Sequence, residues 1–150
     1  MKAIKPYFTF LLLLGLLLMA GSLFAQQAEL IVDVHSLRDN KGTVRAWVFA
    51  TKKGFPNKGE TALTHADARI TNGRTQLRFQ GLEVGKSYAV SIIHDANDNK
   101  VLDSNWMGIP SEGFGCSRDA PARMGPPDYE DALFRFESAG QQIKIKMRYM

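Results

Sequence analysis

Apolar and polar residues alternate with a period of two in the short runs that follow residue 28 of this chain. In the first run, Leu30, Val32 and Val34 fall on one side, whereas Asp33 and His35 fall on the other. Successive side chains of a β-strand point to opposite faces, so this pattern is typical of a half-buried strand. A helix would instead repeat its apolar residues three and four positions apart. The alternation therefore predicts an all-β domain.

Several such runs are separated by turn residues, and the Asn72-Gly73 pair is typical of a tight hairpin. Short strands with one apolar face bury that face by packing sheet on sheet or by closing into a barrel, and we favour sheet packing. A short helical turn is expected near residues 127–131. The expected fold is a seven-stranded antiparallel β-sandwich of immunoglobulin-like type, with strands at residues 29–35, 44–50, 65–71, 74–80, 87–94, 132–136 and 143–149.

The N-terminal residues have the pattern of a secretory signal peptide. Lys2 and Lys5 precede an uncharged apolar stretch, and small residues follow it up to Ala25. We expect cleavage between Ala25 and Gln26, which divides the chain into a signal peptide at residues 1–25 and a domain at residues 26–150. The protein is then exported to the periplasm or the cell exterior.

The alternative for this segment is an uncleaved N-terminal membrane anchor. Residues 7–25 are uncharged throughout and just long enough to span a bilayer. Gly21 and Ser22 interrupt the apolar run where a spanning helix would continue, which favours cleavage and leaves no stable membrane span. No cysteine stands directly after the apolar run, where a lipoprotein would carry its lipid, so a lipoprotein anchor is excluded.

The rest of the chain has the size and charge of one ordinary domain. Removal of residues 1–25 leaves 125 of the 150 residues, enough to bury one core. It also reduces the 19 basic residues to 17, against 15 acidic ones, so nothing indicates a nucleic-acid partner. The single cysteine, Cys116, excludes an intrachain disulfide.

A long segment at residues 95–130, between the fifth and sixth expected strands, is the first candidate for function, because β-connections of this length usually have a role. Its start places side-chain oxygens at the first, third, fifth and ninth positions and a backbone carbonyl at the seventh. Calcium prefers six to eight hard oxygen ligands in this kind of spacing. The expected metal ligands are Asp95, Asn97, Asn99, the carbonyl of Val101, and Asp103.

The match to an EF-hand loop is partial. Lys100 stands at the position of the usual glycine, and Trp106 stands at that of the bidentate glutamate. Waters or the acidic residues Asp128, Glu130 and Asp131 would have to complete the coordination, and affinity would be weak, with a Kd of about 10⁻⁴ to 10⁻³ M. The alternative is that these Asx residues form local turns without a metal.

Three groups of residues carry a family resemblance. The chain resembles the DUF2141 family of exported bacterial proteins, and a Gly-Leu-x-x-Gly-x-x-Tyr stretch at residues 81–88 is also similar to transthyretin-like and Cna-B-like sandwiches. The resemblance implies the sandwich fold but no activity. Lys100 departs from the glycine common in the family, and Cys116 from an aromatic residue. The resemblance rests on residues 94–105 (His-Asp-x-Asn-x-Asn-x-x-x-Asp-x-Asn), residues 108–115 (Gly-Ile-Pro-x-Glu-Gly-Phe-Gly) and residues 125–134 (Gly-Pro-Pro-x-Tyr-x-Asp-Ala-x-Phe).

Other residues give weaker signals. A nucleophilic pair of Cys116 and His94 can be imagined, but no motif orients it, and His35 and His65 show no metal-ligand spacing with His94. We expect the three histidines on solvated faces or at strand ends. The carboxylate of Glu112 is a second candidate for a hydrolase.

Two further sets of side chains have a functional and a structural interpretation. Trp106, Phe114 and Tyr129 are either an aromatic platform for a sugar or partner, or anchors of the long loop. The basic residues of several strands are either stripes for an anionic surface or ordinary solvated faces, and we favour the second interpretation. These basic residues are Arg69, Arg74, Arg78, Lys144, Lys146 and Arg148.

Taken together, these observations predict an exported, non-enzymatic module. Calcium would order the loop at residues 95–130, and the loop would present a surface to an envelope protein or a carbohydrate. A small exported hydrolase that uses the same loop is the alternative function.

Overall fold

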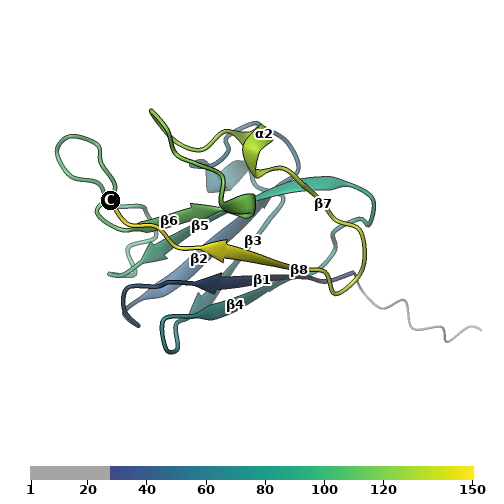
Figure 1. Cartoon of the computed structure of the whole chain (residues 1–150), viewed down its shortest axis with the longest axis horizontal. Helices are drawn as coiled ribbons and strands as arrows, with labels where there is room; N and C mark the ends of the chain where they lie inside the picture. The colour runs from purple at the N-terminus through teal and green to yellow at the C-terminus, as the bar shows by residue number, and fades with distance from the viewer. Residues whose placement is uncertain (1–27) are drawn as a thin grey trace, which may run out of the picture.

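The computed structural model describes residues 28–150, in which two β-sheets pack face to face (Figure 1). The smaller sheet has the order β4-β1-β8 and the larger one has the order β3-β2-β5-β6, with β7 paired to β5. The expected β-sandwich is therefore confirmed. The strands are β1 (Leu30–His35), β2 (Thr43–Phe49), β3 (Thr64–Arg69), β4 (Thr75–Phe79), β5 (Ser87–Asp95), β6 (Gly113–Cys116), β7 (Phe134–Arg135) and β8 (Gln142–Lys146).

The signal-peptide and membrane-anchor hypotheses concern residues 1–25, which lie outside the described residues. Within residues 28–150, no helix has both the length and the apolar composition needed to cross a membrane.

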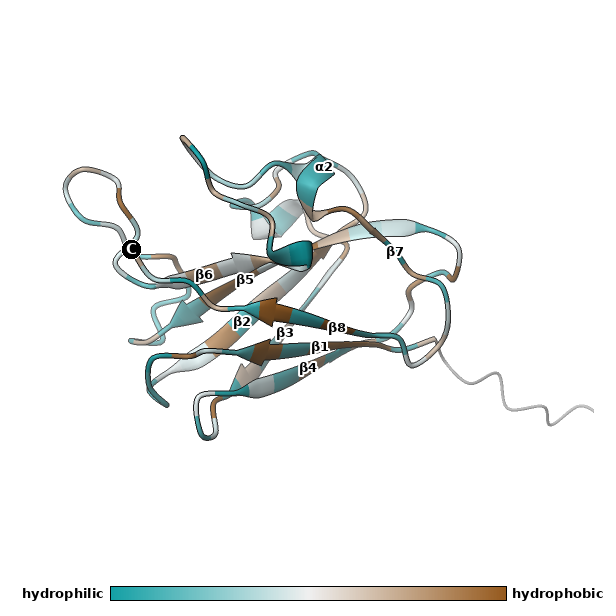
Figure 2. Cartoon of the chain, viewed as in Figure 1, coloured by the Kyte–Doolittle hydropathy of each residue, from teal (hydrophilic) through white to brown (hydrophobic). Residues whose placement is uncertain are grey.

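The alternation seen in the sequence places the core between the two sheets. Leu30, Val32 and Val34 of β1 are fully buried, and the intervening side chains are half-buried. Val44 and Val48 of β2 face them from the other sheet within one apolar cluster. Figure 2 shows the resulting mixture of apolar and polar residues along the strands. Each of these aliphatic side chains contributes about 1.5–3 kcal/mol when fully buried.

The topology corrects two predictions. Residues 28–150 contain eight strands where seven were expected, because β6 lies inside the segment that was interpreted as one continuous loop. The sheets are also not wholly antiparallel, since β8 pairs in parallel with β1. The last connection of the chain crosses from the larger sheet to the smaller one, so β8 arrives in the same direction as β1.

Strand β6 has no alternation to reveal it, because it consists of Gly-Phe-Gly-Cys. Both glycines are required by close packing. A Cβ at Gly113 would lie 2.6 Å from the Tyr149 ring, and one at Gly115 would lie 2.9 Å from the Lys146 carbonyl oxygen. The C-terminal segment can therefore lie across β6 only because β6 has no side chains at these two positions.

After β6, the observed strands differ more from the predicted strand boundaries. A helix, α2 (Tyr129–Ala132), forms near the helical turn expected at residues 127–131. It takes up the start of the strand expected at residues 132–136, which is reduced to β7. Two short 3-10 helices, η1 (Gly59–Thr61) and η2 (Ser117–Asp119), complete the elements.

The larger sheet is buried at one end on its outer face, the face turned away from β1. A small cluster of Ala89, Cys116, Ala120 and Ala132 covers this end, and the last of these residues belongs to α2. Phe55 closes the cluster through edge-to-face contacts. Its ring centroid lies 5.3 Å from that of Phe49 and 5.5 Å from that of Tyr129. The loops after β5 and β6 border the remainder of the outer face.

Candidate functional site

The strand register arranges the side chains of the outer face in rows. His65, Trp47, Ser91 and Cys116 are successive partners across β3, β2, β5 and β6. The next row consists of Asp67, Arg45, Ile93 and Phe114. The outer face is therefore apolar over β5 and β6 and charged over β2 and β3.

A cavity of about 900 Å³, here called the outer cavity, lies over the apolar part of this face. Trp47, Ile93 and Phe114 belong to its floor. Its walls come from four segments that are distant in the sequence. These wall residues include Pro56, Gly59, Val101, Leu102, Ile109, Pro110, Pro126, Pro127 and Met150.

One wall of the outer cavity is a hairpin-like loop after β5, residues 96–112. Its two limbs are joined where the Ser111 N–H donates to the Asp103 carbonyl over 2.9 Å and the Asn105 N–H to the Ile109 carbonyl over 2.9 Å. The Asn105 side-chain oxygen also accepts the N–H of Ile109 and of Met107. The loop is thus held in one shape by its own backbone.

The base of this loop is closed by Glu112, whose side chain is buried. One carboxylate oxygen accepts the Ala96 N–H over 2.8 Å, and the other accepts the Asp103 N–H over 3.1 Å. The two limbs are therefore bridged by one carboxylate. From the sequence, Glu112 was predicted only as a hydrolase candidate, and its role in closing the loop was missed.

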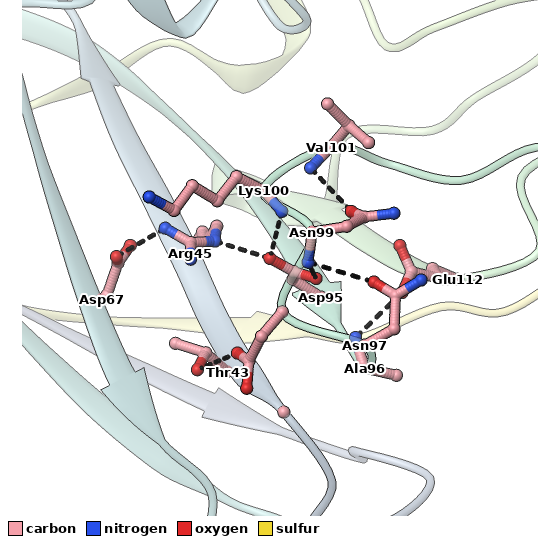
Figure 3. A network of polar contacts seen from close by, with 12 residues as sticks. Thr43, Arg45, Asp67, Asp95, Ala96, Asn97, Asn99, Lys100, Val101 and Glu112 are labelled. Atoms are coloured by element: carbon pink, nitrogen blue, oxygen red, sulfur yellow. Dashed lines mark hydrogen bonds and ion pairs between the residues drawn. The ribbon is translucent and has the colours of Figure 1, made fainter.

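Asp95 fixes the same loop to the sheet, as Figure 3 shows. Its fully buried carboxylate accepts the N–H of Asn99 over 2.9 Å and that of Lys100 over 2.8 Å. It also accepts Nε–H of Arg45 over 2.7 Å. Both oxygens therefore face donors of the protein itself.

Arg45 was absent from the predicted site. Its guanidinium lies between two carboxylates, with Nη1 2.6 Å from Asp67 and Nε 2.7 Å from Asp95. The hydrogen bond to Asp95 and the nearby negative charges raise the pKa of Arg45 above its ordinary value. An arginine at the polar position of a central strand, two residues before Trp47, was the available signal.

A second contact holds the loop from its other side. The Thr43 hydroxyl donates to Asp98 over 2.6 Å, and the Arg69 guanidinium lies 3.2 Å from the same carboxylate. The hydroxyl first, and then the cation, lower the pKa of Asp98. Residues 95–100 are therefore tied to both β2 and β3.

The other expected metal ligands lie on the exposed side of the loop. The amide nitrogens of Asn97 and Asn99 donate to the Asp103 carboxylate over 2.8–3.0 Å. The Val101 N–H donates to the Asn99 side-chain oxygen over 3.0 Å. Three of the five residues thus converge through their side chains, whereas Asp95 lies in the separate network with Arg45.

The comparison with known proteins returns one family. A family model described as an uncharacterized protein conserved in bacteria, DUF2141, matches residues 32–144. The chain belongs to the DUF2141 family. The comparisons with curated proteins and with solved structures returned no match.

In this DUF2141 protein, the calcium hypothesis stays a prediction. Asp95 does not fit the role of ligand in this conformation, because its oxygens are taken by Arg45 and two backbone N–H groups. Within residues 28–150, no three acidic, histidine or cysteine side chains are grouped in a way that could hold an ion. Asn97, Asn99 and Asp103 remain as side chains that a calcium ion could recruit.

In this DUF2141 protein, Cys116 and His94 are not arranged as a nucleophile and its base. Cys116 lies on the outer face, whereas His94 points inward from β5 and is fully buried. The ring nitrogens of His94 contact the Tyr149 hydroxyl over 2.7 Å and the Lys41 carbonyl over 2.8 Å. His94 lies at the end of β5, as one of the two expected positions has it, but it is buried there and links β5 to the C-terminal segment, so the expectation of a solvated face is wrong for this residue.

Burial also changes the chemistry of the thiol. The Cys116 side chain is nearly inaccessible, and desolvation raises its pKa from 9.0 to about 12. At neutral pH it is therefore protonated and a poor nucleophile. His35 lies in β1 of the smaller sheet, His65 on the outer face of the larger sheet, and His94 faces inward from β5, so the histidines of this DUF2141 protein do not form one site.

The three aromatic residues singled out from the sequence do not have one common role. Trp106 is 92% exposed at the tip of the loop, Phe114 lies in the cavity floor, and Tyr129 packs against Phe55. Arg148 donates to the Asp119 carbonyl over 2.6 Å and so has a structural contact. The remaining basic residues, Arg69, Arg74, Arg78, Lys144 and Lys146, are exposed on strands or turns.

Proposed function

We propose that this protein is an exported, non-catalytic binding module that holds a small ligand in the outer cavity. The observation that carries the proposal is the cavity itself. Its volume of about 900 Å³ falls within the range of about 300–1,000 Å³ that is usual for small-molecule sites. The floor offers Trp47, Ile93 and Phe114, so the ligand has an apolar or aromatic body.

Exposed apolar side chains on the segments that line the outer cavity support the same proposal, and Val101, Ile109 and Met150 line it directly. Surface positions of a folded domain rarely collect large apolar side chains without a partner. Here they occur on the loop after β5, on the loop after β6 and at the C-terminus, all of which border the outer cavity. Their exposed fractions are 56% for Val101, 92% for Trp106, 58% for Met107, 40% for Ile109, 101% for Met124 and 72% for Met150.

Calcium and export are parts of this proposal that rest on the sequence. An ion bound by Asn97, Asn99, Asp103 and the Val101 carbonyl would stiffen the wall of the cavity. A signal peptide at residues 1–25 would place the module where calcium is abundant, and where an envelope protein or a carbohydrate is an accessible partner.

The hydrolase alternative has no specific observation in its favour. The carboxylate of Glu112 is occupied by two backbone donors, and the Cys116 thiol is buried with a raised pKa. Among residues 28–150, neither group has a hydrogen bond to a side chain that could act as its base. A binding role therefore accounts better for the outer cavity.

The proposal is tested by titration with Nile red, an uncharged apolar dye that becomes fluorescent in apolar sites. Ile109→Arg introduces a charge into the cavity wall, and Val84→Arg introduces the same charge at an apolar position that is 52% exposed and outside the cavity. We expect saturable binding, weakened at least about tenfold by Ile109→Arg and unchanged by Val84→Arg. Absence of saturable binding, or equal loss in both variants, would refute the proposal.

A further inference from the structure

A second cavity adjoins the outer cavity on the same face of the sheet. This side cavity, of about 440 Å³, lies over β2 and β3. Four residues line both cavities, namely Trp47, Gly59, Glu60 and Lys100. The apolar cavity thus continues into one whose floor carries Arg45, His65 and Asp67.

Trp47 stands at the junction of the two cavities. Gly59 lies directly against the pyrrole part of its indole, since a Cβ at Gly59 would fall 2.4 Å from Nε1. The adjacent strand residues His65 and Ser91 flank it in the register. The indole is therefore held in place between an apolar compartment and a polar one.

Some of the charged side chains around the junction have no ion-pair partner among residues 28–150. Arg45 is paired with Asp67 and with Asp95, and the second negative charge of this group is on Asp95, whose buried carboxylate also accepts two backbone N–H groups. Lys100 and Glu60 line both cavities, and neither takes part in an ion pair among residues 28–150. Figure 3 shows the Lys100 side chain extending from the loop alongside Arg45. The junction therefore presents one uncompensated cation and one uncompensated anion beside an indole.

We infer that the ligand is a single-chain amphiphile with a zwitterionic headgroup. This inference rests on the proposed function, and it adds the chemistry of the polar end. The hydrocarbon chain occupies the outer cavity, while the anionic part of the headgroup contacts Lys100 and its cationic part contacts Glu60. A quaternary ammonium group gains a further attraction from the face of Trp47.

Charge complementarity selects this headgroup over the others. An anionic head would be attracted by Lys100 and repelled by Glu60. A cationic head would be attracted by Glu60 and repelled by Lys100. An uncharged head would leave both side chains without a partner. Only a head with both charges compensates both residues at once.

The test compares four decyl amphiphiles below their critical micelle concentrations. They are decylphosphocholine, decanoate, decyltrimethylammonium and decyl maltoside. The chain has two tryptophans, so Trp106→Phe leaves Trp47 as the reporter of fluorescence at the junction. We expect decylphosphocholine to bind about tenfold tighter than the other three.

Two charge-removing variants assign the selectivity to the junction. Lys100→Met should reduce the affinity for decylphosphocholine and increase the affinity for decyltrimethylammonium. Glu60→Gln should also reduce the affinity for decylphosphocholine, but it should increase the affinity for decanoate. Lys86→Met, at an exposed lysine outside both cavities, should change nothing.

The outcomes distinguish failure of the zwitterionic headgroup preference from failure of the apolar binding site. Equal binding of all four amphiphiles, or a preference that survives both variants, would overturn the inference and leave the apolar site intact. A preference of the unaltered protein for decanoate, for decyltrimethylammonium or for decyl maltoside would overturn it as well. If no amphiphile and no Nile red binds, the proposed function itself fails.

Discussion

Arg45 and Asp95 form a buried ion pair that joins the centre of the larger sheet to the wall of the outer cavity. Nε of Arg45 lies 2.7 Å from the carboxylate, and the two side chains are 13% and 0% exposed. The same carboxylate accepts the N–H groups of Asn99 and Lys100. The position of the loop at residues 96–112 therefore depends on a residue about 50 positions earlier in the chain.

Replacement of Arg45 by methionine should destabilise the protein strongly. The variant leaves Asp95 buried without its cation, which typically costs about 3–5 kcal/mol. Urea unfolding should show a loss of this size, and hydrogen exchange should show faster exchange at the Asn99 and Lys100 amides. Arg78→Met removes an exposed pair with Glu29 and should cost no more than about 1 kcal/mol. Equal losses in the two variants would contradict the role given to Arg45.

Replacement of Gly42 by alanine should displace the backbone at Asp95 and Ala96, where the loop at residues 96–112 begins. Gly42 has φ of +64°, and a Cβ there would lie 1.9 Å from the Asp95 carbonyl oxygen. We expect a loss above about 3 kcal/mol, because backbone strain of about 1–2 kcal/mol adds to the clash. Gly81→Ala is the control, since Gly81 has φ of +78° with open space around it and should show the strain alone. Thermal unfolding of both variants measures the difference.

The buried thiol should make stability depend on alkaline pH. Cys116 has an ordinary pKa of 9.0 that burial raises to about 12. Between these values the unfolded chain loses the thiol proton while the folded chain keeps it, so the free energy of unfolding falls as the pH rises. The slope from this group is at most about 1.4 kcal/mol per pH unit. Urea unfolding at pH 8 to 10.5 should show a shallower decline for Cys116→Ala than for the unaltered protein, and parallel curves would contradict the assignment.

The calcium prediction can be separated from the structural role of the loop. Calcium should raise the melting temperature at millimolar concentrations, in keeping with an expected Kd of about 10⁻⁴ to 10⁻³ M. Asp103→Ala should abolish this rise, because it removes the carboxylate on which Asn97 and Asn99 converge. Asp33→Ala, at a half-buried position in β1, is the control for loss of one acid. Calorimetry that detects no calcium heat for the unaltered protein would refute the prediction.

The fold was predictable because a period of two is a local signal. Leu30, Val32 and Val34 needed no knowledge of their partners to be assigned to one face of a strand. Strand β6 lacked that signal, since glycine at positions 113 and 115 is required by the neighbouring Tyr149 and Lys146. Its existence is decided by packing against a segment about thirty residues later in the chain.

The candidate site was predictable only in part, for a related reason. The oxygen-rich spacing drew attention to residues 95–103, which do form a tightly organised loop. Spacing could not show that the Asp95 carboxylate is turned toward Arg45, or that Glu112 bridges the limbs of the loop. Arg45 is 50 positions from Asp95, and Glu112 is 16 positions from Ala96, so local spacing could not predict either contact.

The sequence by itself determined the all-β class, most of the strands and the importance of the long segment after β5, because these follow from the order of neighbouring residues. Only the tertiary structure decided that Trp47 and Phe114 share a cavity floor and that Lys100 and Glu60 both line the junction of the two cavities. The physical reason is that a cavity is formed by strand register and by the loops that cross a sheet. Both depend on contacts between residues that are far apart along the chain.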